Sequence, residues 1–182
     1  MSAAKSLSRR PTFTENLCGA SAIEFALVAP LLMLVVFGGY QFSEATSAYR
    51  KTTLTARTVA DLTTQYTTMG PSDIATVLNA SAQVMAPFET SSLTIVLTEY
   101  SMSSAGVATV TWSKALNGTP LKADSEVTLP SGICQPNASV ILAAVTYRFT
   151  PAVFYRLTGP MPMSSSIYMS PRSVASISYS AT

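Results

Sequence analysis

The ionisable side chain in the most unusual setting is the carboxylate of Glu24. It is the one charge between Ala20 and Tyr40, where every other residue is apolar or small. A carboxylate at the centre of a bilayer costs about 2.5–3.5 kcal/mol even on lenient insertion scales. Because Glu24 lies about one helical turn inside the apolar run, two interpretations are open. The carboxylate reaches the lipid headgroups, or it pairs with a positive charge within the membrane.

The sequence contains few other residues that could catalyse a reaction or bind a metal. The sequence has no histidine, which removes the commonest general base and the commonest metal ligand and excludes a Ser-His-Asp triad. It has no glycine-rich phosphate-binding loop. Other carboxylates, among them Asp61, Asp73, Asp124 and Glu126, are scattered along the chain. We therefore expect no enzymatic activity, no cofactor and no metal site.

The amino-acid composition also limits the functional classes to which the protein can belong. Charged residues make up 11% of the chain and the net charge is +2. Nucleic-acid-binding proteins carry a strongly basic stripe, so we expect no nucleic-acid partner. The two cysteines, Cys18 and Cys134, lie on opposite sides of the apolar run. In a membrane protein they would occupy different compartments, so we expect no disulfide between them and an unpaired thiol at Cys134.

The element that positions Glu24 is a membrane-spanning helix over residues 20–42. About 20 apolar residues are needed to cross a bilayer core of about 30 Å, and a single span must be helical to satisfy its own backbone. Basic residues before the run favour a cytoplasmic N-terminus only weakly, since Arg50, Lys51 and Arg57 follow it. A secretory signal peptide is the competing interpretation, but the run is longer than the usual 7–15 residues.

Helical periodicity continues beyond the run. Apolar residues recur at three- and four-residue spacings over residues 43–69, which predicts an amphipathic helix ended by Gly70-Pro71. A second helix is predicted to begin at Ser72, with Ser72 as its N-cap and Asp73 in its first turn. Pro87 is expected to close it.

The pattern then changes to strands. Leu93–Thr98 and Val107–Trp112 predict an antiparallel hairpin, and Ser139–Phe149 predicts a third strong strand. Residues 154–163 are expected to be irregular because of Pro160 and Pro162, and 174–179 could return as an edge strand. The predicted fold class is α+β: a transmembrane helix extended by an amphipathic helix, a short second helix, then a small antiparallel sheet.

The surroundings of Glu24 also form a recognisable pattern. Gly19 is followed by four small or apolar residues, then by Glu24 and Phe25 and the rest of the apolar run. This arrangement resembles the processing site of type IV prepilins. With several short motifs further along, the sequence resembles the TadE-like pseudopilins of the bacterial tight-adherence (Tad, Flp-type) pilus system. Those motifs are Arg57-Thr58-Val59-Ala60-Asp61-Leu62, Ala86-Pro87-Phe88, Val110-Thr111-Trp112-Ser113, Val145-Thr146-Tyr147 and Pro171-Arg172.

The resemblance implies that a prepilin peptidase cuts between Gly19 and Ala20, on the cytoplasmic side of the inner membrane. The new Ala20 ammonium would then supply the positive charge that the Glu24 carboxylate of a neighbouring subunit needs. The implied role is that of a minor pseudopilin-like component of pilus assembly that stays in the inner membrane or joins the pilus. Its implied partners are the peptidase, other Tad pseudopilins, the pilin, inner-membrane platform proteins and membrane lipid.

The implied organisation has four parts. They are a cytoplasmic leader (1–19), a transmembrane helix (20–42), a protruding amphipathic helix (43–69) and a periplasmic α+β domain (70–182). The alternative function is an uncleaved, single-pass anchored periplasmic binding domain, in which Glu24 would have no role in assembly. An anchored hydrolase lacks the residues to carry its reaction.

Overall fold

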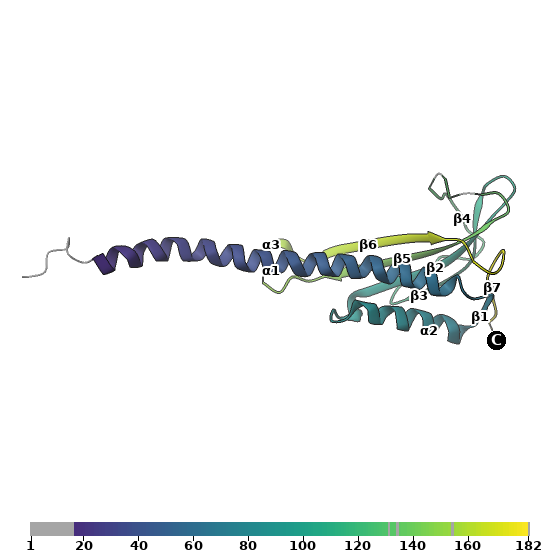
Figure 1. Ribbon diagram of the computed structural model, residues 1–182. Coiled ribbons are helices and arrows are strands. Elements are labelled where there is room, and N and C mark those ends of the chain that lie inside the picture. The colour runs from purple at the N-terminus through teal and green to yellow at the C-terminus, as the bar shows by residue number, and fades with distance from the viewer. Residues whose placement is uncertain (1–16, 131, 134, 154, 182) are drawn as a thin grey trace, which may run out of the picture. The chain divides into compact units, whose positions relative to one another are not determined.

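The computed structural model (Figure 1) describes residues 17–130, 132–133, 135–153 and 155–181. The predicted leader as far as residue 16 and the thiol of Cys134 lie outside these residues, so the expectations about them stay predictions. The chain forms two compact units that meet between Phe42 and Ser43. Helix α1 (Leu17–Thr63) contributes residues to both units.

The first unit consists of the amino-terminal part of α1. The helix continues through Pro30 without interruption, as membrane helices tolerate. Large apolar side chains are exposed along this part of the helix, from Ile23 to Phe42, and Leu27 is the most exposed of them at 81%. A soluble protein would bury such a surface, so its exposure is consistent with the predicted surroundings of lipid.

The second unit, which begins at Ser43, contains the remainder of α1 and all the other elements. This unit has two further α-helices, α2 (Pro71–Ala82) and the short α3 (Tyr155–Thr158). Four strands are long: β2 (Leu93–Met102), β3 (Ala108–Leu116), β5 (Ser139–Phe149) and β6 (Met161–Met169). The short strands are β1 (Thr68–Met69), β4 (Glu126–Val127) and β7 (Ser178–Tyr179).

Five strands form an antiparallel sheet in the order β4-β3-β2-β5-β6. The central strand β2 pairs with β5 from Leu93 opposite Tyr147 to Ser101 opposite Ser139. Its pairing with β3 shifts by a bulge between Glu99 and Tyr100. Strands β1 and β7 form a separate parallel pair. The predicted fold class, helices first and then an antiparallel sheet, is confirmed.

The main core lies between the helices and one face of the sheet. From β2 it takes Leu93, Ile95 and Leu97, which alternate along the strand and are fully buried. From α1 it takes small residues at helical spacing, among them Ala48, Ala56, Val59 and Ala60. Two buried threonines of α1 satisfy their hydroxyls within the helix: Thr52 donates to the carbonyl of Ala48 (2.9 Å) and Thr63 to that of Val59 (2.7 Å). The buried hydroxyl of Thr55 has no partner among the described residues.

Three predicted helix boundaries need correction. The second helix begins at Pro71 with Gly70 as its N-cap, not Ser72, because the Asp73 carboxylate accepts the Gly70 N–H at 2.9 Å. The first helix ends at Thr63, well before Gly70. The second ends at Ala82 and is followed by a 3-10 turn rather than being closed by Pro87.

Strand β6 was not predicted, since part of it was expected to be irregular. It begins at Met161 and accommodates Pro162 because it is an edge strand, where a missing N–H can face away from the sheet. The last extended segment is also different from the prediction. Instead of joining the edge of the main sheet, β7 pairs with β1 next to the end of α1.

Candidate functional site

The predicted processing and assembly residues lie together at the start of α1. The helix begins at Leu17, so Gly19 and Ala20 are in its first turn, and Glu24 follows Ala20 by four residues. Side chains at this spacing share one helix face, with Cβ atoms about 5–6 Å apart. All three residues are exposed. Within the described part of the chain, no hydrogen bond or ion pair reaches the Glu24 carboxylate.

The carboxylate is surrounded along the helix by apolar side chains. Ile23, Phe25 and Leu27 are 74%, 70% and 81% exposed. Among the described residues, α1 contains the one stretch that is long and apolar enough to cross a bilayer, and no residue of its most apolar 18 is buried. The apolar part of α1 therefore suggests a membrane anchor that carries a single carboxylate near its amino end.

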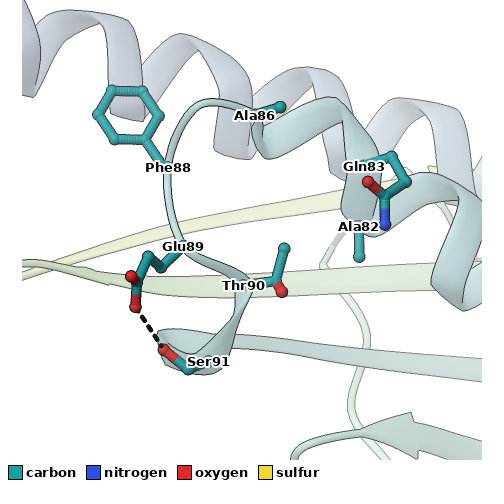
Figure 2. A pocket seen from close by; sticks show the side chains of 7 residues that line it. All are labelled: Ala82, Gln83, Ala86, Phe88, Glu89, Thr90 and Ser91. Atoms are coloured by element: carbon teal, nitrogen blue, oxygen red, sulfur yellow. Dashed lines mark hydrogen bonds between the residues drawn. The ribbon is translucent and has the colours of Figure 1, made fainter.

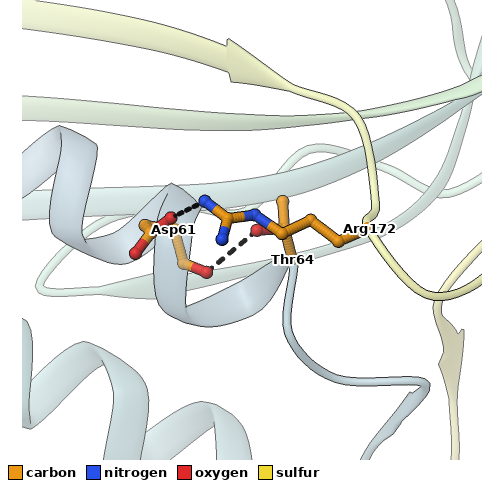
Figure 3. Close-up of polar contacts among 3 residues, drawn as sticks. All are labelled: Asp61, Thr64 and Arg172. Atoms are coloured by element: carbon orange, nitrogen blue, oxygen red, sulfur yellow. Dashed lines mark hydrogen bonds and ion pairs between the residues drawn. The ribbon is translucent and has the colours of Figure 1, made fainter.

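The carboxyl end of α1 is tied to the C-terminal segment (Figure 3). The Arg172 guanidinium forms an ion pair with the Asp61 carboxylate, and the backbone N–H of Arg172 donates to the carbonyl of Thr64 at 3.2 Å. This contact joins two of the short motifs, which lie 111 residues apart in the sequence.

A second carboxylate, Glu99 on β2, was missed by the sequence analysis. Its side chain is fully buried. One oxygen, Oε1, accepts the backbone N–H of Ile177 at 2.8 Å and the hydroxyl of Ser176 at 3.0 Å, while Oε2 has no partner. Glu99 thus holds the segment before β7. The signal that could have found it is strand parity, because Glu99 continues the inward series Leu93, Ile95 and Leu97.

Trp112 and Tyr147 are part of the core. Trp112 is 5% exposed, and its indole N–H donates to the carbonyl of Ile177 at 2.8 Å. Tyr147 is 6% exposed and packs against the ring of Phe88, with centroids 6.1 Å apart. Burial raises the pKa of the Tyr147 phenol, and nearby Glu89 adds to the shift. These side chains support the fold and do not form a ligand platform.

One of the surface pockets lies beside the turn between α2 and β2 (Figure 2). It is lined by Ala82, Gln83, Ala86, Phe88, Glu89, Thr90 and Ser91. Glu89 is the single ionisable side chain of this set, and its carboxylate accepts the Ser91 hydroxyl at 3.5 Å. A lone carboxylate without a second acid, a base or a metal ligand beside it does not form a hydrolytic pair. Among the described residues, no cluster of three potential metal ligands occurs.

Comparison with known proteins points to the same part of the chain as the geometry. The family model described as TadE-like protein matches residues 19–61. No curated protein and no solved structure matches the chain at a significant level. The matched segment starts at Gly19, contains Glu24 and the whole apolar part of α1, and ends at Asp61, the residue that pairs with Arg172. Residues 19–61 are therefore similar to TadE-like proteins, and this similarity suggests a protein related to the Tad pilus system.

Proposed function

We propose that the protein is a minor pseudopilin-like membrane component of Tad pilus assembly, processed by prepilin peptidase between Gly19 and Ala20. The observation that carries the proposal is the position of Glu24. Its carboxylate lies one helical turn from Ala20, on an exposed apolar helix that offers it no partner among the described residues. Such a group is costly in lipid, so a partner charge is needed.

Cleavage after Gly19 would create that charge. The new α-amino group of Ala20 is mostly protonated at neutral pH. In an assembly, the ammonium of one subunit would meet the Glu24 carboxylate of its neighbour and fix the register of their helices. The pairing is strong where water is excluded and weak where it is not, so it would favour subunits packed side by side in the membrane.

The surroundings of Gly19 support a role in processing rather than in packing. A side chain built at Gly19 would meet no heavy atom within 4 Å. The backbone there is in the helical region that any residue can adopt. The fold therefore does not require glycine at this position, and recognition by a peptidase is a sufficient reason for it.

The proposed arrangement is a single-pass protein of the bacterial inner membrane with a cytoplasmic leader and a periplasmic globular unit. The division into leader (1–19), transmembrane helix (20–42), amphipathic segment (43–69), whose helix ends at Thr63, and α+β domain (70–182) is part of this proposal. So are the partners: the prepilin peptidase, other Tad pseudopilins, the pilin and the platform proteins of the inner membrane. The main role of the globular unit would be contact with these proteins.

The test is the mature amino terminus of the protein purified from cells that contain the peptidase. Edman degradation or mass spectrometry should find Ala20 as the first residue. Retention of the leader in such cells would refute processing and leave the alternative, an uncleaved anchored binding domain.

A matched pair of variants separates processing from folding. Gly19→Leu should abolish cleavage, whereas Gly38→Leu, at another helical glycine with open space around it, should leave cleavage unchanged. Equal cleavage of both variants would mean that Gly19 is not part of a recognition site.

A further inference from the structure

The loop between β5 and β6 exposes an unusual amount of apolar surface. Val153, Tyr155 and Leu157 are 46%, 50% and 83% exposed. Among the described residues beyond Phe42, seven large apolar side chains are exposed, and these three lie between positions 153 and 157. Single exposed apolar residues need no explanation, but a cluster of them marks a contact surface.

The composition of the loop suits a lipid surface. Tyr155 combines an apolar ring with a polar hydroxyl, the property that concentrates tyrosine at membrane–water interfaces. Two exposed arginines are close to these apolar residues in the sequence. Arg148 is near the end of β5, and Arg156 on α3 lies between Tyr155 and Leu157. Arginine can bury its aliphatic stem while its guanidinium reaches a lipid phosphate.

Contacts inside the globular unit fix the position of this loop. At one end of the unit, Arg172 pairs with Asp61 and follows the end of β6 by three residues. At the other end, the Lys51 ammonium donates to the carbonyl of Val84 at 3.2 Å. Four residues after Val84, the ring of Phe88 packs on that of Phe149, 6.2 Å away, at the point where β5 ends and the loop begins.

The loop therefore lies at the end of the unit where α1 enters it. From Asp61 back to Ser43 the helix covers about 27 Å, and β6 covers about 26 Å from Met169 back to Met161. Figure 1 shows α3 at the opposite end of the sheet from β7. Ser43 follows directly on the last residue of the apolar span, so this is the end of the unit that is tethered to the membrane.

We propose that the β5–β6 loop is a second membrane contact, which inserts Tyr155 and Leu157 into the lipid interface. Buried apolar area would provide the binding, as in interfacial segments that lie on a membrane without crossing it. The contact would restrict the globular unit to the surface beside its own span. The inference requires only that the apolar part of α1 is embedded in a membrane.

The experiment uses the full-length chain with Cys18→Ser and Cys134→Ser, reconstituted in vesicles of phosphatidylethanolamine and phosphatidylglycerol. An environment-sensitive fluorophore is attached at Leu157→Cys. The matched control is Val107→Cys, which is 41% exposed and lies in the turn between β2 and β3. A label at Val35→Cys, inside the span, reports that the protein is anchored.

We expect nitroxide-bearing lipids to quench the label at position 157 several-fold more strongly than the label at 107, and aqueous iodide to quench it several-fold less. Equal quenching at 157 and 107 would overturn the proposal. Protection from iodide without lipid quenching would also overturn it, because a protein partner would then cover the loop. If the label at 35 is not quenched by lipid, the anchor is absent and the proposal fails with it.

Discussion

Arg172, close to the carboxyl end of the chain, pairs with Asp61 on the last turns of α1, and its backbone N–H binds the carbonyl of Thr64. The contact joins the end of the TadE-like segment to the segment that leads into β7. Next to it, β7 pairs with β1, which follows α1 directly. The last part of the globular unit's sequence thus packs around the carboxyl end of this helix.

The ion pair itself should add little stability. The side chains of Arg172 and Asp61 are 61% and 41% exposed, and exposed pairs contribute at most about 1 kcal/mol because water and salt screen them. We expect Arg172→Ala to lower the free energy of unfolding by less than about 1 kcal/mol, measured by urea titration of the protein in detergent.

The dependence of this stability difference on salt concentration tests whether screening weakens the ion pair. The difference between Arg172→Ala and the unmodified protein should shrink at high salt. Arg57→Ala, which removes an exposed arginine one turn earlier on α1, is the control and should not show the same dependence. A loss of several kcal/mol at Arg172 would mean that the pair is better shielded than its exposure indicates.

The buried carboxylate of Glu99 should matter more, and its effect should be local. Glu99→Leu leaves the N–H of Ile177 buried without an acceptor, which costs about 1–3 kcal/mol. The same substitution removes the buried Oε2 atom, which has no hydrogen-bond partner, and this gain offsets part of the loss in the free energy of unfolding. We therefore expect the clearest change in amide exchange at Ile177, faster on the order of ten- to a hundredfold.

Trp112, the one tryptophan in the chain, gives an independent measurement. Its indole donates to Ile177, so release of this segment should shift its fluorescence to longer wavelength. Glu99→Gln keeps an oxygen acceptor and should change both signals less than Glu99→Leu does. Glu126→Leu, on the exposed edge strand β4, is the control. Unchanged exchange at Ile177 in Glu99→Leu would show that the carboxylate does not hold this segment.

These contacts mark the limit of what the sequence could predict. Strand alternation and helical periodicity were strong for β2, β3, β5 and the long helix, because burial of one face dictates the pattern. Serines and Pro162 hid β6, since an edge strand is half solvated and lacks a clear apolar alternation. The Asp61–Arg172 pair depends on tertiary packing over 111 residues, which no local pattern encodes.

The residues of the candidate site also divide into those that local sequence patterns could predict and those that depend on tertiary packing. Gly19, Ala20 and Glu24 are close in sequence and lie on one helix, so their relative positions follow from helix geometry alone. Glu99 differs, because its meaning depends on what faces it. Strand parity indicates that its side chain points inward, but the N–H of Ile177 that it accepts comes from 78 residues further along.

Stability should fall at alkaline pH through Tyr147. Burial, aided by Glu89, raises the pKa of its phenol in the folded protein above the ordinary value of 10.0. The unfolded chain therefore releases this proton first as the pH rises, and the stabilising contribution is complete below about pH 10. This contribution to the free energy of unfolding decreases as the pH rises from about 10 to the pKa of the folded protein, and it is absent at higher pH. Burial raises the pKa of Tyr100 in the same direction.

The measurement is the free energy of unfolding on either side of pH 10. Tyr147→Phe should lose less stability than the unmodified protein over this interval, because it has no phenol to ionise. Tyr147→Phe with Tyr100→Phe should lose still less. An equal alkaline loss in all three proteins would assign the pH dependence to other groups.

The last prediction concerns Glu24 in assembly. Glu24→Leu and Glu24→Gln both remove the negative charge, and Leu also removes the cost of placing a polar group in lipid. If the carboxylate exists to bind the Ala20 ammonium of a neighbour, both variants should be inserted and processed but should lose most pilus output or adhesion. Glu44→Gln removes a carboxylate that lies beyond the span, and this control variant should retain normal pilus output and adhesion. Full function of Glu24→Gln would show that a neutral polar group suffices, and the charge pairing would then have to be abandoned even if Ala20 is the mature amino terminus.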